Sequence, residues 1–231
     1  MIKQLLWPET CPFCGKVSKE GTCPACEKKL VKLLVREPRC MKCGKPVRTE
    51  EQEFCYDCLY KKHFFDKGYS VWLHRPPVSN SIYQFKYHNQ RAFARIYTEK
   101  IIAYYGEWIR KLQVDYIVPV PLHFRRRWKR GYNQAEILAK EIGRNLQIEV
   151  NTQLVRRVRY TDPQKKLDSH TRKSNLKNAF CICGDMKKIH RVLLVDDIYT
   201  TGNTIDEIAR ILKEKGAENV YFLTISIGQG Y

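Results

Sequence analysis

The sequence predicts an α/β domain with a mostly parallel sheet, preceded by a small module that metal ions hold together. Two observations lead to this prediction. A strand, a loop, a helix and a further strand follow one another over residues 192–227, which is the order of a βαβ unit. Eight of the 10 cysteines form four Cys-x-x-Cys units within the first 58 residues. The 231 residues suffice for one ordinary domain with an appendage, and we divide them into residues 1–66 and 67–231.

Hydrophobic patterns predict the other elements of the main domain. Apolar runs indicate strands, and apolar residues that recur at about 3.6 positions indicate helices. Polar stretches rich in arginine indicate loops, one of which is long enough for a mobile loop or lid. The expected strands are 69–73, 116–120 and 154–158 (a strand or a turn), the expected helices are 81–109 and 135–146, and the expected loops are 122–131 and 161–178.

The segment from Val192 to Thr204 is the most informative about ligand binding. A continuous apolar run, typical of a parallel strand, ends in two aspartates, and a turn rich in threonine and glycine leads into a helix. In open α/β sheets ligands bind beyond the carboxyl ends of strands, and a helix N-terminus attracts phosphate. Carboxylates accept hydrogen bonds from sugar hydroxyls. We therefore expect a ribose 5-phosphate site formed by Asp196, Asp197, Thr200, Thr201, Gly202, Asn203 and Thr204.

Positive charge is concentrated in the middle of the chain. The formal net charge is +18, and residues 119–177 hold 15 Lys and Arg against 5 Asp and Glu. Such a surplus favours a polyanionic partner at one surface, although a scattered solvated charge is the alternative. Phe124, Trp128 and Tyr132 alternate with these cations, as in surfaces that stack unpaired bases. The same aromatic residues could instead pack in the core, and the sequence leaves both interpretations open.

The clustered cysteines predict zinc rather than disulfides. Two thiolates three residues apart converge readily on one ion, and a turn-rich segment this short needs a staple to fold. Four thiolates complete the coordination of Zn²⁺, so two structural ions are expected. Pairing in order and interleaved pairing both remain open, and His63 is a spare candidate that we interpret as a surface residue. The expected ligands are Cys11, Cys14, Cys23, Cys26, Cys40, Cys43, Cys55 and Cys58, whereas Cys181 and Cys183 are interpreted as buried free thiols.

Two features bear on the location of the protein. No apolar stretch approaches the roughly 20 residues that cross a bilayer. The start of the chain, Met1 to Trp7, is too short for the apolar part of a signal peptide. We expect a cytoplasmic protein without a membrane-inserted segment.

Residues 192–204 resemble the signature of the type I phosphoribosyltransferases. In that family the acidic pair holds the ribose hydroxyls of 5-phosphoribosyl 1-diphosphate (PRPP), the loop holds its 5-phosphate, and Mg²⁺ accompanies the ligand. Residues 117–134 and 157–164, with Leu167, Arg172 and Asn175, resemble the narrower ComF family, and the Cys-x-x-Cys module extends that resemblance to the N-terminus. By analogy with related transferases, the residues expected to contact the diphosphate or an acidic partner are Arg125, Arg130, Arg157 and Arg159.

The resemblance implies a role in natural transformation. A ComF protein would handle incoming single-stranded DNA at the inner face of the membrane, beside an ATP-driven translocase. The alternative is an active phosphoribosyltransferase of nucleotide metabolism or salvage, and a third is a ligand-sensing scaffold whose zinc module docks partners. The sequence identifies no acceptor nucleobase site and no catalytic residue, so it does not decide whether the protein is an enzyme.

Overall fold

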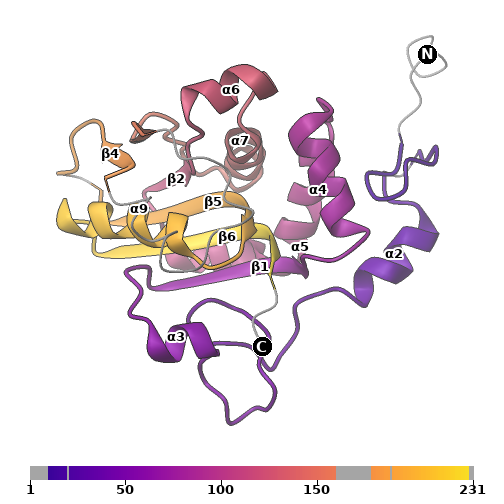
Figure 1. Cartoon of the computed structure of the whole chain (residues 1–231), viewed down its shortest axis with the longest axis horizontal. Helices are drawn as coiled ribbons and strands as arrows, with labels where there is room; N and C mark the ends of the chain where they lie inside the picture. Colours follow the sequence, from indigo (N-terminus) through magenta and orange to yellow (C-terminus); the bar gives the residue numbers. More distant parts are fainter. Residues whose placement is uncertain (1–9, 20, 160–177, 188, 229–231) are drawn as a thin grey trace.

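The computed structural model describes residues 10–19, 21–159, 178–187 and 189–228, in which helices cover both faces of a central sheet (Figure 1). Its elements follow the expected alternation of strands and helices. In chain order they are α2 (Pro24–Val31), α3 (Tyr56–Tyr60), β1 (Lys67–Leu73), α4 (Val78–Tyr87), α5 (Phe93–Leu112), β2 (Tyr116–Pro119), α6 (Phe124–Arg130), α7 (Gln134–Leu146), β3 (Val155–Arg157), β4 (Phe180–Ile182), β5 (Arg191–Tyr199), α9 (Asn203–Glu214) and β6 (Asn219–Ile227).

The central sheet is fully parallel, with strand order β1-β6-β5-β2. Because the strands are parallel, their carboxyl ends all lie at the same end of the sheet. Asp196 of β5 lies in register with Thr224 of β6. One apolar cluster contains Trp72, α5 and α7, and a second cluster contains Phe222 and α9. Strands β3 and β4 form a separate antiparallel pair. In the sequence they flank residues 160–177, which include most of the expected lid and lie outside the described residues.

Irregular segments cover both edges of the sheet. Residues 33–42 run along β1, where the Val35 N–H donates to Val71 O (3.0 Å) and the Leu73 N–H donates to Leu33 O (2.8 Å). On the opposite edge, the Ile117 N–H of β2 donates to Glu149 O at 2.9 Å. The N-terminal cysteine-rich segment is therefore hydrogen-bonded along the β1 edge of the sheet and is an integrated part of the domain.

Two expectations about local structure are wrong. The helix expected over 81–109 is two helices, α4 and α5, because residues 88–92 turn the chain between them. The loop expected over 122–131 contains helix α6, which the His123 side chain caps and Gly131 ends with φ 76°. Residues 124–130 include no glycine or proline, so nothing in their composition opposes a helix.

Candidate functional site

The structure brings the eight N-terminal cysteines together as two separate groups. Within each group the four sulfur atoms lie within 4.8 Å of one another, and the groups are Cys11, Cys14, Cys23 and Cys26, then Cys40, Cys43, Cys55 and Cys58. The pairing is therefore the one in order, not the interleaved one. Sulfur atoms around tetrahedral zinc lie about 3.8 Å apart at the usual bond length. The Cys14–Cys23 and Cys43–Cys55 sulfur distances of 3.6 and 3.5 Å agree with this geometry, so both groups suit structural zinc.

Each group belongs to a ribbon that packs on a different part of the main domain (Figure 1). We call residues 10–35 the first ribbon and residues 36–66 the second ribbon. The first ribbon places Phe13 against Trp72 and Tyr97, with ring centroids 5.7 and 6.2 Å apart. The second ribbon places Phe65 against Phe222 at 5.0 Å and against Tyr199 of β5 at 6.1 Å.

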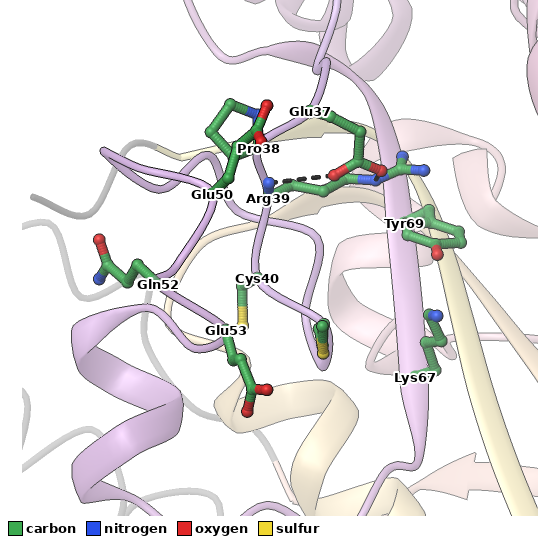
Figure 2. Close-up of a pocket in the computed structure, with 10 residues that line it drawn as sticks. Glu37, Pro38, Arg39, Cys40, Glu50, Gln52, Glu53, Lys67 and Tyr69 are labelled. Carbon is green, nitrogen blue, oxygen red and sulfur yellow. Dashed lines mark hydrogen bonds and ion pairs between the residues drawn. The ribbon is translucent and has the colours of Figure 1, made fainter.

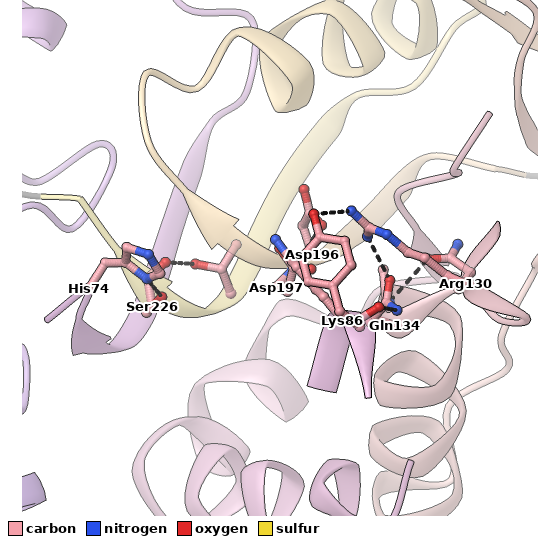
Figure 3. A network of polar contacts seen from close by, with 11 residues as sticks. His74, Lys86, Arg130, Gln134, Asp196, Asp197 and Ser226 are labelled. Carbon is pink, nitrogen blue, oxygen red and sulfur yellow. Dashed lines mark hydrogen bonds and ion pairs between the residues drawn. The ribbon is translucent and has the colours of Figure 1, made fainter. Parts of the chain in front are cut away.

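Asp196 and Asp197 lie near the carboxyl end of β5, where they belong to the strand itself. Lys86 of α4 forms an ion pair with Asp197 at 2.8 Å, which Figure 3 shows. Loss of water contact, together with the charge of Asp197, raises the pKa of Asp196 to about 7. Asp196 therefore changes protonation near neutral pH, because the charge of Lys86 offsets only part of these two effects.

A polar network continues from Lys86 to helix α6 (Figure 3). The Gln134 side chain donates to the Lys86 carbonyl oxygen at 3.3 Å and accepts from Arg130 at 3.0 Å. Arg130 also donates to the Tyr87 hydroxyl at 3.1 Å. One of the four arginines predicted from the sequence is thus tied to the acidic pair through α4.

The other three predicted arginines occupy different surroundings. Arg157 is the second that lies near the acidic pair: burial and the charge of Arg126 lower its pKa to about 10, and Asp196 acts in the opposite direction. Arg125 is exposed on α6, beside the Phe124 ring at 5.9 Å. Arg159 is exposed, next to the residues outside the described part of the chain.

The turn between β5 and α9 leads through a glycine into the N-terminus of a helix. Gly202 is the N-cap of α9 with φ 74°, a region that favours glycine. A Cβ atom there would also lie 2.4 Å from the Tyr199 hydroxyl oxygen. Helix geometry leaves the first N–H groups of α9 without an intrahelical acceptor. These groups, with the hydroxyls of Thr200, Thr201 and Thr204, can receive an anion next to the acidic pair.

Helix α6 presents an exposed surface of cations and aromatic rings. The Trp128 and Phe124 side chains are 89% and 68% exposed, whereas Tyr132 is buried. The sequence left open whether these three aromatic residues are exposed or packed in the core. Phe124 and Trp128 face solvent, and Tyr132 belongs to the core. A hollow of about 1060 Å³ runs along this helix, lined by Phe124, Arg125, Arg126, Arg127, Trp128, Lys129 and Gly131.

A second cavity, of about 500 Å³, lies between the second ribbon and β1 (Figure 2). Glu37, Glu50 and Glu53 contribute carboxylates to its wall, and none of the residues predicted to bind the phosphorylated ligand lines it. Arg39 is held there by Glu37 at 2.7 Å and lies over the Tyr69 ring at 4.0 Å. Because the three carboxylates outnumber the two cations of the wall, Arg39 and Lys67, we assign this cavity no part in binding the phosphorylated ligand.

Several residues were missed or misjudged from the sequence. Lys86 and Lys61 carry no local signal, because their partners lie more than 100 positions away in the chain. His63 is buried against Phe65 and 3.4 Å from Asp206, not on the surface as expected. Cys181 and Cys183 are half-buried, less enclosed than expected, with their sulfur atoms 3.7 Å apart.

Known proteins share this architecture. The double zinc ribbon domain family matches residues 2–59, and the phosphoribosyl transferase domain family matches residues 87–226. The chain therefore belongs to the proteins that carry a phosphoribosyltransferase domain. The purine phosphoribosyltransferase of Pyrococcus horikoshii Ot3 covers 59% of this chain and 91% of its own, with 17% identity and a TM-score of 0.35. That likeness is too weak to guide the assignment of any residue.

Curated relatives narrow the family. Competence protein F of Haemophilus influenzae is 34% identical over 88% of this chain and 89% of its own length. DNA utilization protein YhgH of Salmonella typhimurium is 34% identical over 92% and 94%, and Competence protein ComFC of Bacillus subtilis is 24% identical over 85% and 80%. The chain is a member of the competence protein F family. Among the described residues, no helix is long and apolar enough to cross a membrane.

Proposed function

We propose that the protein binds PRPP with Mg²⁺ at the β5–α9 loop and handles single-stranded DNA during its uptake. The observation that carries the ligand half is the acidic pair beside a glycine-capped helix N-terminus, with Gly202 at φ 74°. Asp196 and Asp197 would hold the ribose hydroxyls, and Thr200 to Thr204 would hold the 5-phosphate. Arg130 and Arg157, which lie nearest the pair, are the better candidates for the diphosphate, and Arg125 and Arg159 for a larger acidic partner.

Magnesium fits the donor set, since carboxylate oxygens are hard ligands and PRPP adds phosphate oxygens. Mg²⁺ would supply charge neutralisation of the diphosphate. The chain itself supplies the orientation: Lys86 holds Asp197, and Gln134 links Lys86 to Arg130. Because the pKa of Asp196 is raised to about 7, affinity for the Mg²⁺ complex should rise as the pH passes through 7 and Asp196 ionises.

Calorimetry with PRPP and Mg²⁺ tests this assignment. We expect wild type to bind and the double variant Asp196→Asn/Asp197→Asn to lose binding. Asp185→Asn, at an exposed aspartate, is the matched control and should bind like wild type. Equal affinity in the double variant and the control would reject the site. Turnover of PRPP in the presence of a nucleobase would favour the alternative, an active phosphoribosyltransferase.

The DNA half of the proposal rests on helix α6. An 89% exposed indole among arginines suits stacking on unpaired bases, worth about 1–3 kcal/mol per base. The neighbouring cations would contact phosphates, so affinity should fall with salt by a slope of about −0.7 per contact. The names of the relatives place them in competence and DNA utilization. For this chain we propose a cytoplasmic location with DNA passed on by an ATP-driven translocase at the membrane.

Two sets of substitutions test the DNA half. Replacing Arg126, Arg127 and Lys129 with Ala should flatten the salt dependence, whereas Trp128→Ala should lower affinity with little change in slope. The matched control removes the same charge from α2 and its C-cap, at exposed Lys28, Lys29 and Lys32, and should leave binding unchanged. If both triple variants weaken binding equally, the net charge of the protein is responsible and α6 is not the DNA surface.

A further inference from the structure

The second ribbon reaches the loop that we assign to the 5-phosphate. Helix α3 contains Cys58 and ends at Tyr60, and the next residue, Lys61, extends its side chain to α9. The Lys61 Nζ donates to Asn203 Oδ1 at 2.5 Å, across 142 positions of sequence. Asn203 is the first residue of α9, directly after the capping Gly202. A cation that originates in the zinc module therefore lies at the N-terminal end of this helix.

The chain after Lys61 is hydrogen-bonded to α9 and to β6, which holds the backbone next to the lysine in place. The Phe64 N–H donates to Asp206 Oδ1 at 2.6 Å, in the first turn of α9. The Asp66 N–H donates to Val220 O, and Asp66 accepts from the Val220 N–H, both at 2.7 Å. The Phe65 ring lies between these two attachments, against Tyr199 and Phe222.

Most groups at this end of α9 favour an anion, and the one carboxylate of its first turn, Asp206, is already hydrogen-bonded to the Phe64 N–H. The first N–H groups of a helix and its dipole already favour an anion there. An ammonium group adds a full charge and strong hydrogen-bond donors to the same place, and ammonium–phosphate bonds are among the stronger ones in proteins. An amide oxygen such as Asn203 Oδ1 is a weaker acceptor for Lys61 than a phosphate oxygen would be.

We propose that Lys61 of the second ribbon contacts the 5-phosphate of the ligand, exchanging Asn203 Oδ1 for a phosphate oxygen when the ligand binds. The inference rests on the proposed function, and it makes the zinc module part of the ligand site. Since coupling between two sites is reciprocal, bound ligand then stabilises the second ribbon, and the zinc-bound ribbon strengthens ligand binding.

The test measures competition by ribose 5-phosphate and by inorganic diphosphate against PRPP for four full-length proteins. These are wild type, Lys61→Gln, Lys61→Arg and the matched control Lys62→Gln, at an exposed neighbouring lysine. Glutamine can still donate to Asn203 but lacks the charge. We expect Lys61→Gln to bind ribose 5-phosphate about 10- to 100-fold more weakly, with diphosphate unaffected. Arginine should preserve most of the affinity, and Lys62→Gln all of it.

Each other outcome contradicts a defined statement. If Lys61→Gln and Lys62→Gln bind ribose 5-phosphate equally well, Lys61 does not contact the phosphate. If Lys61→Gln weakens diphosphate by the same factor, the lysine acts through its general field and the contact is rejected. If wild type itself fails to bind PRPP, the proposed function fails, and that result is obtained before any lysine variant is measured.

Zinc release provides a second measurement that does not depend on affinity. In wild type, saturating PRPP should slow the transfer of about one of the two zinc ions to a chromogenic chelator. In Lys61→Gln, PRPP at a concentration that saturates this variant should no longer have that effect. Equal protection in both proteins would overturn the coupling through Lys61. Zinc content and melting temperature, measured beforehand, show that each variant is folded.

Discussion

The two ribbons contain similar motifs, Cys-Pro-Phe-Cys-Gly-Lys and Cys-Met-Lys-Cys-Gly-Lys, but the structure sets them in different surroundings. In the first ribbon Cys14 is exposed and Cys23 half-buried, whereas in the second ribbon only Cys58 is not fully buried. The first ribbon packs on α5 and β1, and the second packs beneath the loop between β5 and α9. Two copies of one metal-binding module can therefore have different roles, which depend more on the part of the domain that each copy contacts than on its own sequence.

Removing the zinc ion of the first or of the second ribbon should give the largest difference between the ribbons, measured as PRPP binding. We expect Cys43→Ser to lose one zinc ion together with PRPP binding, because the second ribbon carries Lys61 and Phe65. Cys14→Ser should also lose one zinc ion but continue to bind PRPP. Metal analysis and calorimetry on the two full-length variants measure both effects. Similar PRPP affinity in the two variants would show that the ribbons are equivalent.

The aromatic anchors of the ribbons should give the next largest effect. Truncating a buried phenylalanine costs about 3–5 kcal/mol of unfolding free energy. Phe65→Ala and Phe13→Ala should both destabilise to about this extent, since both rings are buried. Only Phe65→Ala should also weaken PRPP, because its ring supports Tyr199 at the start of the loop. Denaturant unfolding with parallel binding measurements separates stability from affinity, and a loss of affinity in Phe13→Ala would contradict the comparison.

A pH dependence of stability, moderate in size, should come from Asp196 at the proposed ligand site and from neither ribbon. The pKa of Asp196 is raised from 3.8 to about 7, so the folded protein holds a proton that the unfolded chain releases. The stability that this provides is complete below pH 3.8 and is lost as the pH rises towards 7. Relative to wild type, Asp196→Asn should therefore gain up to about 2 kcal/mol between pH 5.5 and pH 8, because one pKa unit corresponds to about 1.4 kcal/mol and wild type stops losing stability once the carboxyl is ionised near pH 7. A difference in unfolding free energy that does not vary with pH would contradict the assignment.

The smallest effect should come from the ion pair of the first ribbon. Lys100 of α5 lies 2.5 Å from Glu27 of α2, and both side chains are partly exposed. Pairs of this kind contribute about 0–1 kcal/mol, less at high salt. Lys100→Ala should therefore lower stability by under about 1 kcal/mol and leave PRPP binding unchanged. A larger loss, measured by denaturant unfolding at two salt concentrations, would mean that charge rather than Phe13 attaches the first ribbon.

Local patterns in the sequence predict much of this architecture. The βαβ unit of β5, α9 and β6 and the four Cys-x-x-Cys units depend on residues close together in the chain, whereas the sequence leaves open how those units pair around zinc. Lys86 and Lys61 could not be predicted, because each acts on a residue that only the fold brings near. The sequence of helix α6 predicts a loop because its charge pattern has no apolar stripe. That absence is explained by its exposure: Trp128, which could have been core, lies in solvent.

Residues 33–42, which run along β1, have a consequence for any attempt to divide the molecule. An open strand edge is a template on which another chain can add, so proteins keep such edges covered. Here the cover is the segment in which the first ribbon continues into the second, and it is hydrogen-bonded to Val71 and Leu73. A fragment that begins at residue 67 would expose that edge together with the apolar surface around Trp72. We expect this fragment to self-associate into strand-paired oligomers, which the full-length chain cannot form along β1.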